Sequence, residues 1–447
     1  MTTTRGAGTG ETGTGETGTG SSRRAVVAGT VGNFIEWYEF GVYGFFATII
    51  AANFFSPDGA GGLESLIKTY ASFALAFFFR PVGAALFGRV GDRIGRKPTL
   101  VLVLLLMTGA TFLIGVLPTY ATVGAAAPWL LTLVRVLQGL SAGGEFGGAV
   151  SVMTEFAPAG KRGLYGSWQS FTVALGLLAG AGLAAILGAV LTADQLALWG
   201  WRVPFLLALP LGLVALWLRL RLEETPSFRR AAAAPHAAVG GEPVAVPGAA
   251  ATARAIAVGA ARLMGWSAAG YTFLVVMPAY LQSSLGASFQ QALVATVLAN
   301  AGFALTILPA GVLSDRIGRR PVMLTGTVLI VVLALPLLNI LQDRGSGTFL
   351  QGLAVLVAGA VVGLIAGPGP AMLSEMFPTG VRYTGLGLAY SLSNAVFSGS
   401  AGLIITALIA QTSDVDIPAY YVMATCVVSA AALATLRRDG HRRPLGE

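Results

Sequence analysis

Five charged residues stand out because they lie inside long apolar segments of the first half of the chain. They are Glu36, Glu39, Arg80, Arg135 and Glu145. A charged side chain deep in a bilayer costs at least about 2.5 to 3.5 kcal/mol on insertion scales, so each one calls for a partner or a function. A buried carboxyl group can take up and release a proton, and a buried guanidinium group can bind an anionic group. These residues therefore indicate ion or proton chemistry inside a membrane.

Helix geometry predicts how these charges pair. A helix rises about 1.5 Å per residue, so Glu36 and Arg80 are expected at similar depths, roughly 16 and 12 Å into their segments. Glu39 and Arg135 both come out at about 21 Å. Glu36, Glu39 and Tyr43 share one helical face, which we expect to line a cavity. The pattern thus predicts two ion pairs, one formed by Glu36 with Arg80 and one by Glu39 with Arg135.

Three acids face two bases in this set, which leaves one carboxylate over. Burial without a nearby cation favours the protonated form of a carboxyl group, as a reversible proton carrier requires. We assign this role to Glu145, with Glu36 and Glu39 as alternatives once a substrate competes for Arg80. Buried ion pairs that only fix helix packing are the alternative interpretation. The glycines around Glu145 favour close packing of a neighbouring helix.

Aromatic and neutral polar residues could complete the site. Trp37, Tyr38 and Phe40 lie beside the glutamates and could bind a cation on their ring faces, although aromatic residues in such segments usually serve packing. The second half has few buried charges, with Arg262 near the end of its segment. We expect it to contribute polar and aromatic contacts from residues such as Tyr271, Tyr280, Asn300, Tyr390 and Asn394.

A basic, glycine-rich connection occurs twice. GRVGDRIGRKP at 88–98 recurs as GVLSDRIGRRP at 311–321, so the chain is a duplicated unit. The repeated aspartate can accept hydrogen bonds from the N-terminus of an adjacent helix or from a nearby arginine, which would latch the two halves together. The alternative is that the arginines only set topology. We assign a cytoplasmic gate to Asp92, Arg93 and Arg96 in the first copy and Asp315, Arg316 and Arg319 in the second.

Composition places the chain in a membrane. Hydrophobic residues make up 55% of it and charged residues 11%, with a mean hydropathy of +0.75, which is too apolar for a soluble surface. The net charge of +8 is dispersed in short clusters, so nucleic-acid binding is not expected. Cys426 is the one cysteine, and His236 and His441 fall in a connector and a tail. We therefore expect no disulfide, no metal site, no cofactor and no enzymatic centre.

About twelve segments are long enough to cross a hydrocarbon core of about 30 Å as helices. The expected spans are 25–50, 65–88, 98–117, 129–154, 164–191 and 201–220, then 255–282, 289–313, 321–341, 349–373, 383–410 and 418–436. Lys and Arg gather in alternate connections, which places both termini in the cytoplasm. The expected organisation is a disordered tail at 1–24, six-helix bundles at 25–221 and 255–436, a cytoplasmic linker at 222–254 and a tail at 437–447.

These motifs resemble the major facilitator superfamily and, within it, the metabolite:proton symporter family. GRVGDRIGRKP is similar to the superfamily's loop signature, and RVLQG at 135–139 to its fourth-helix signature. Further similar stretches are GNFIEWYEFGVYGFFA, FFFRPVGAALFG, LSAGGEFGGA, KRGLYGSWQ, GWRVPFLLALPLGL, LEETPSF and EMFPTGVRYTGLGLAY. The resemblance implies an all-α membrane protein of twelve transmembrane helices, in two six-helix bundles related by a pseudo-two-fold repeat. It also supports the five buried charges as cavity and coupling positions, and Asp92 and Asp315 as gate positions.

The resemblance implies a proton-coupled symporter of the bacterial inner membrane that works by alternating access. Because Arg80 and Arg135 would attract a carboxylate, we expect a small organic acid such as 2-oxoglutarate as the substrate. The alternative is a zwitterion such as proline or glycine betaine, since YSLSNAVFSGSA at 390–401 resembles oxoglutarate carriers whereas IPAYYVM at 417–423 resembles proline and betaine carriers. A transporter-like membrane sensor is a further alternative. The expected partners are the solute, the proton whose gradient drives uptake, and the lipid bilayer, with the protein acting as a monomer.

Overall fold

The structure is a computed structural model of the chain. It describes residues 16–59, 61–94, 96–143, 146–147, 150, 153–154, 157–158, 160–220, 248–343, 345–378 and 381–437. Within these ranges the side chains of 16–29, 88, 91–97 and 383 are not described. Glu145, most of the predicted linker at 222–254 and most of both predicted tails therefore lie outside the described residues.

The elements that the structure describes in the first half are all helices. Its elements are α1 (Glu16–Phe45), α2 (Ala47–Phe54), α3 (Leu63–Ile94), α4 (Arg96–Val116), α5 (Tyr120–Val123), α6 (Ala126–Ala142), α8 (Arg162–Val190), α9 (Ala193–Leu198), η1 (Gly200–Arg202), α10 (Val203–Leu206) and α11 (Ala208–Leu220). Glycines let its helices approach closely. A side chain at Gly139 or Gly143 of α6 would meet the backbone of α3, so their spacing of four sets one α3–α6 packing face.

The second half repeats this plan. Its elements are α13 (Ala249–Tyr271), η2 (Thr272–Val276), α14 (Met277–Leu285), α15 (Phe289–Ile317), α16 (Arg319–Gln342), α17 (Thr348–Ala366), α18 (Gly369–Ser374), α19 (Arg382–Ser393), η3 (Asn394–Gly399), α20 (Ala401–Thr412) and α21 (Ile417–Ala434). η2 and η3 are π-helical, a rare geometry that often marks functional positions.

The described helices account for the twelve predicted spans. Nine of them are long and apolar enough to cross a membrane, and α6 is a shorter apolar helix. The pairs α1–α2 and α13–α14 occupy the first and seventh predicted spans. Leucine, valine and tryptophan side chains such as Leu305, Val332 and Trp217 are exposed on the outer helix faces, as a lipid-facing surface requires.

The first helix differs from the sequence prediction. We predicted a disordered tail to residue 24, but α1 begins at Glu16. Once the apolar part of a helix has formed, each added residue fixes few dihedral angles for one more hydrogen bond, so the helix can extend into a polar stretch. The helix therefore starts before the predicted end of the tail at residue 24.

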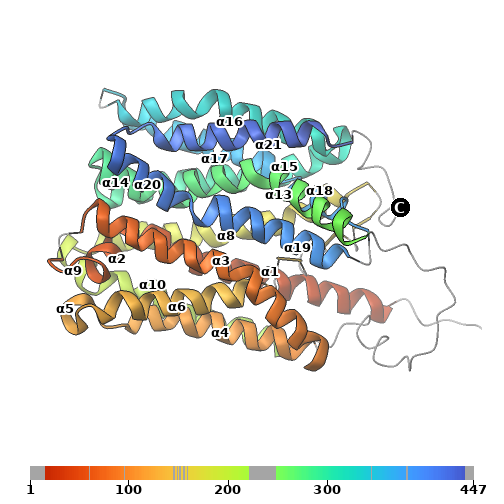
Figure 1. The fold of residues 1–447 in the computed structure, drawn as a ribbon, viewed down its shortest axis with the longest axis horizontal. Coiled ribbons are helices and arrows are strands. Elements are labelled where there is room, and N and C mark those ends of the chain that lie inside the picture. Colours follow the sequence, from red (N-terminus) through yellow and green to blue (C-terminus); the bar gives the residue numbers. More distant parts are fainter. Residues whose placement is uncertain are drawn as a thin grey trace, which may run out of the picture.

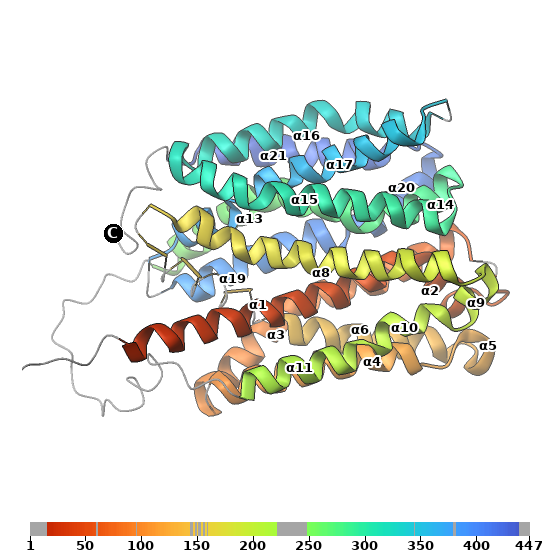
Figure 2. The same ribbon diagram turned by 180° about the vertical axis from the view of Figure 1, so that it is seen from behind.

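The two halves meet along two lines of helices. On one side α8 lies between α1 and α15 (Figure 2). On the other side α3 packs against η3 and α20 (Figure 1). The described chain starts and stops at one end of the molecule, where α1 begins and α21 finishes, and we call this the terminal end. The opposite end carries α2, α5, α9 and α14.

Candidate functional site

The predicted pair of Glu36 and Arg80 is present at the centre of the first half. Glu36 comes from α1 and Arg80 from α3, and both side chains are buried. The Arg80 Nη2 atom lies 3.4 Å from Glu36 Oε1. Breaking a buried ion pair by removing one partner typically costs about 3 to 5 kcal/mol, because the other charge is left uncompensated. The pair therefore fixes α1 against α3 and keeps both charges in place.

Aromatic rings enclose the Arg80 guanidinium group. Its central carbon lies 4.2 Å from the ring centroid of Phe77, 4.3 Å from that of Phe40 and 5.8 Å from that of Trp37. Desolvated cation–π contacts of this kind are worth about 2 kcal/mol. The rings of Trp37 and Phe40, considered from sequence as a wall for a cation, thus face the protein's own arginine. Tyr38 instead donates a hydrogen bond to the Pro204 carbonyl, 2.9 Å away.

Arg135 of α6 lies in a second aromatic enclosure. It has no exposed surface, and its guanidinium carbon lies 4.1 Å from the Tyr43 ring centroid and 4.8 Å from that of Phe73. The Tyr43 hydroxyl in turn lies 2.6 Å from Ser72 Oγ. Tyr43, predicted to share the face of the two glutamates, therefore helps to bury Arg135.

The predicted ion pair of Glu39 with Arg135 is not formed, and two intervening side chains link these residues. Arg135 Nη1 donates to Gln138 Oε1 at 2.5 Å, and Gln138 Nε2 donates to Thr111 Oγ1 at 2.6 Å. The Thr111 hydroxyl then donates to Glu39 Oε2 at 2.8 Å. We call Glu39, Thr111, Gln138 and Arg135 the relay. The relay residues come from α1, α4 and α6. A change in the charge of Glu39 therefore alters the hydrogen bonds that link α1 to α4 and α4 to α6.

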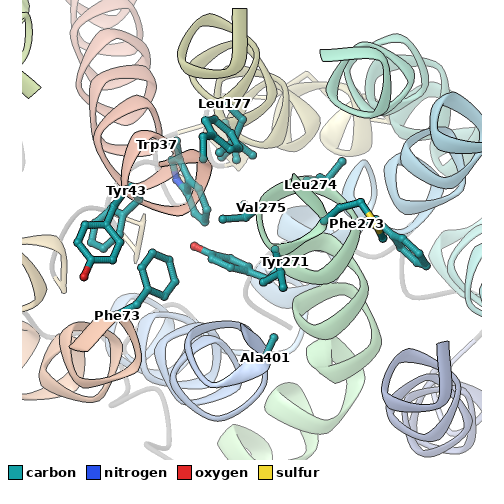
Figure 3. Packing of buried hydrophobic residues seen from close by; sticks show 14 of the residues in the cluster. Trp37, Tyr43, Phe73, Leu177, Tyr271, Phe273, Leu274, Val275 and Ala401 are labelled. Carbon is teal, nitrogen blue, oxygen red and sulfur yellow. The ribbon is translucent and has the colours of Figure 1, made fainter. Parts of the chain in front are cut away.

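A small cavity of about 30 Å³ lies between the two halves, and one of its walls is Trp37, whose ring centroid lies 5.8 Å from the Arg80 guanidinium carbon. Its lining residues are Trp37, Val173, Leu177, Trp266, Ser267, Gly270, Tyr271, Leu274, Val275, Phe303, Tyr390, Asn394 and Ser398. Figure 3 shows Trp37 of the first half opposite Tyr271 of the second, with Leu177 and Val275 beside them. A space of this size holds about one or two water molecules. A metabolite therefore needs the cavity to widen.

The polar lining of the second half is held by its own hydrogen bonds. Ser398 Oγ donates to Asn394 Oδ1 at 2.8 Å, and Asn394 Nδ2 donates to the Tyr390 carbonyl at 3.0 Å. Ser267 and Ser393 hydroxyls lie 2.9 Å apart. The Tyr390 ring stacks on Phe146 of the first half with centroids 3.4 Å apart. Tyr390 and Asn394, both predicted as site residues, thus line the cavity.

The second copy of the repeated motif joins the halves at the terminal end. Asp315 Oδ1 accepts from the backbone N–H of Gly163 at 2.7 Å, and Oδ2 accepts from that of Leu164 at 2.9 Å. These donors belong to the first turn of α8, where free N–H groups and the helix dipole favour an anion. The contact predicted for this aspartate, acceptance from an adjacent helix N-terminus, is present.

Three more charges extend this contact. Arg319 Nη1 lies 2.7 Å from Asp315 Oδ1, and its Nη2 lies 2.9 Å from Glu375 Oε1. Arg162 Nη1, from the first half, lies 3.5 Å from the same Glu375 oxygen. We call Asp315, Arg319, Glu375 and Arg162 the latch. Arg316, also predicted for the gate, is exposed, and the side chains of Asp92, Arg93 and Arg96 lie outside the described residues.

The sequence reasoning missed four of these residues. Gln138 lies three positions after Arg135 on the same helix face, which was a usable signal for the relay. Thr111 gave no signal, because a threonine in an apolar segment is common. Arg162 and Glu375 were visible as charges at span ends, but their pairing joins positions from opposite halves of the chain.

The opposite end is also closed. The rings of Phe46 and Phe289 lie with centroids 5.3 Å apart, and Thr48 Oγ1 of α2 donates to Gln282 Oε1 of α14 at 3.0 Å. Contacts between the halves are therefore present at both ends of the molecule.

Comparison with known proteins identifies the family. Residues 25–238 match the family described as Sugar (and other) transporter, and residues 259–446 match the Major Facilitator Superfamily. The proline/betaine transporter of Salmonella typhimurium is 33% identical over 94% of this chain and 84% of its own length. The citrate-proton symporter of Klebsiella pneumoniae is 36% identical over 92% of this chain and 94% of its own. The chain belongs to the major facilitator superfamily.

A solved structure supports the same fold. The crystal structure of a D-xylose-proton symporter aligns with a TM-score of 0.72 at 18% identity, over 92% of this chain and 97% of that one. The resemblance to the superfamily and the twelve-helix fold predicted from sequence are confirmed. As a superfamily member, the protein is a membrane transporter and not an enzyme.

Proposed function

We propose that this transporter takes up a small zwitterion of the proline or betaine type together with a proton. The observation that carries the proposal is the Glu36–Arg80 pair beside an aromatic cavity. It offers one cation, one anion and ring faces within a single site. The relatives named as proline/betaine transporters and as a citrate-proton symporter support symport of a small charged metabolite.

Charge matching favours the zwitterion. The carboxylate of such a solute pairs with Arg80, while its cationic group is received by Glu36 and by the faces of Trp37 and Tyr271. Arg80 and Glu36 then each exchange their partner in the ion pair for the opposite charge of the solute. A dicarboxylate or tricarboxylate would instead place extra negative charge beside Glu36. We therefore place the zwitterion first, in contrast to the preference that Arg80 and Arg135 suggested from sequence, and an organic acid such as citrate becomes the second candidate.

The relay supplies the proposed proton site. Protonation of Glu39 removes the negative charge that strengthens the hydrogen bond from Thr111. Thr111 and Gln138 can then change their hydrogen bonds, and Arg135 can change its partner. Protonation is in this way linked to the packing of α1, α4 and α6. Glu145 remains a second proposed carrier, on the sequence argument given above.

Alternating access requires each end of the molecule to open in turn. We propose that the latch is the gate of the terminal end and that this end faces the cytoplasm, with both termini inside and the protein in a bacterial inner membrane. The basic residues in the connections of this end support that orientation. The contacts of α2 with α14 and of Phe46 with Phe289 form the opposite gate.

Uptake by the purified protein in proteoliposomes tests the proposal. An inward proton gradient is imposed, and labelled proline, glycine betaine, citrate and 2-oxoglutarate are compared with and without a protonophore. We expect gradient-dependent accumulation of proline or betaine, and its loss in Glu36→Gln. Glu64→Gln is the matched control, because Glu64 is an exposed acid paired with Lys68 at 2.6 Å. Uptake that ignores the gradient would refute symport, and accumulation of the organic acids alone would refute the zwitterion.

A further inference from the structure

The hydroxyl group of Tyr271 has no role in the protein's own packing. Tyr271 is the last residue of α13 and is 5% exposed. Among the cavity-lining residues that the structure describes, it alone has a buried polar side-chain atom without a hydrogen-bond partner. A hydroxyl group buried in this way costs about 1 to 3 kcal/mol. A phenylalanine would fill the same space without that cost.

The ring of Tyr271 crosses from the second half into the first. Its centroid lies 5.3 Å from that of Phe77, 5.9 Å from Trp37 and 6.1 Å from Phe73. Figure 3 shows the hydroxyl end directed toward this group of rings, away from its own helix. The hydroxyl is therefore directed into the first half, at the junction of the two halves.

The charged groups near Tyr271 define what it can bind. The phenol lies within electrostatic range of Arg80, Glu36 and Arg135. The Nε and Nη2 groups of Arg80 make no hydrogen bond in the described structure, although Nη2 faces Glu36 across the 3.4 Å ion pair. A phenol O–H and guanidinium N–H groups at one place are donors that suit the two oxygens of a carboxylate.

We infer that Tyr271 is a substrate-binding residue whose hydroxyl donates a hydrogen bond to the carboxylate of the solute. Arg80 of the first half receives the same carboxylate, so the solute joins the two halves through one group. This inference rests on the proposed function for the solute class and adds a specificity-determining residue to it. The cavity widens when the solute enters, and η2 follows Tyr271 directly, so the residue lies at a place where the helix geometry is already irregular.

The test compares Tyr271→Phe with the wild-type protein, using proline and glycine betaine as separate probes. Betaine has a carboxylate but no N–H group, so it can accept from the phenol but cannot donate to it. A hydrogen bond to a charged group is worth about 10- to 100-fold in affinity. We expect the KM for both solutes to rise by about that factor, with the maximal rate changed less than about threefold.

Tyr70→Phe is the matched control. Tyr70 is also buried with an unpartnered hydroxyl, but it does not line the cavity, so both KM values should stay at the wild-type level. The unloaded Tyr271→Phe protein should unfold at the wild-type temperature or above, since a costly hydroxyl has been removed. Its stabilisation by added proline should fall in step with the rise in KM.

Three outcomes would overturn the inference. Unchanged KM values for both solutes would show that the hydroxyl does not touch the solute. A rise for proline alone would show that the phenol accepts from the amine. A fall in the unfolding temperature of the unloaded protein, with KM unchanged, would make the hydroxyl structural. If the wild-type protein accumulates citrate and neither zwitterion, the proposed solute class fails, and the same two variants assayed with citrate still decide whether Tyr271 binds a carboxylate.

Discussion

The latch makes a quantitative prediction for the variant Asp315→Asn. The substitution keeps the shape of the side chain but removes its charge and replaces one acceptor oxygen by an NH2 donor. The hydrogen bonds from Gly163 and Leu164 lose their charge assistance, one of them also loses its acceptor, and Arg319 loses one of its two acids. A hydrogen bond to a charged group contributes about 1 kcal/mol more than a neutral one. Three such losses amount to about 3 kcal/mol, or roughly 100-fold in the balance between the closed and open terminal end.

A reporter thiol measures this balance. Ser167 of α8 is buried next to the latch, and in a Cys426→Ala background the variant Ser167→Cys provides a single thiol. A membrane-impermeant maleimide is applied from the terminal side of the membrane. We expect Asp315→Asn to raise the labelling rate at least about tenfold, the full factor being reached only while the closed form still dominates.

The control is Arg316→Gln, which removes a charge from the neighbouring exposed position and should leave the labelling rate unchanged. The reasoning would be refuted if Asp315→Asn labelled at the wild-type rate, because the terminal end would then be held by contacts other than the latch. If Arg316→Gln also raised the labelling rate, net charge at this end, and not the hydrogen bonds to α8, would control opening.

The remaining predictions concern packing and coupling. Gly143→Ala places a methyl group against the backbone of α3 and should destabilise the protein by about 1 to 3 kcal/mol in thermal unfolding, whereas Gly109→Ala, which meets nothing within 4 Å, should not. Gln138→Leu interrupts the relay and should lower gradient-driven accumulation at least about tenfold while solute exchange continues; equal loss of both would make Gln138 structural. Glu145→Gln should abolish gradient-driven accumulation and spare exchange, and a loss of both in transport assays would assign Glu145 to binding or packing.

The depth of each residue along its helix predicted the Glu36–Arg80 ion pair correctly, but it did not predict that two side chains separate Glu39 from Arg135. Glu36 and Arg80 lie at similar depths on consecutive spans, and their side chains meet in an ion pair. Glu39 and Arg135 are also at matching depths, but Thr111 and Gln138 lie between them on α4 and α6. The depth of a residue along its helix does not give the lateral distance between that helix and another. Hydrogen-bonding side chains from a third helix can lie in the space between them.

Contacts between the halves could not be predicted from the sequence, for a different reason. The repeated motif indicated that Asp315 meets a helix N-terminus, because an aspartate among arginines needs donors. Nothing in the motif identifies α8 as that helix, since α8 starts about 150 positions earlier in the chain. Tyr271 likewise drew attention only as a polar aromatic residue, since its unpartnered hydroxyl is a property of the packed structure.

The two halves divide the chemistry between them. The described buried charges of the cavity region, Glu36, Glu39, Arg80 and Arg135, lie on first-half helices and are packed among aromatic rings. The second half lines the cavity with hydroxyl, amide and ring groups on α13, α19 and η3, and a π-helical segment directly follows both α13 and α19. Single π-helical turns are frequent at functional sites. The groups proposed to carry the proton lie in the first half, so we expect substitutions in η2 or η3 to alter which solute is taken without uncoupling it from the proton.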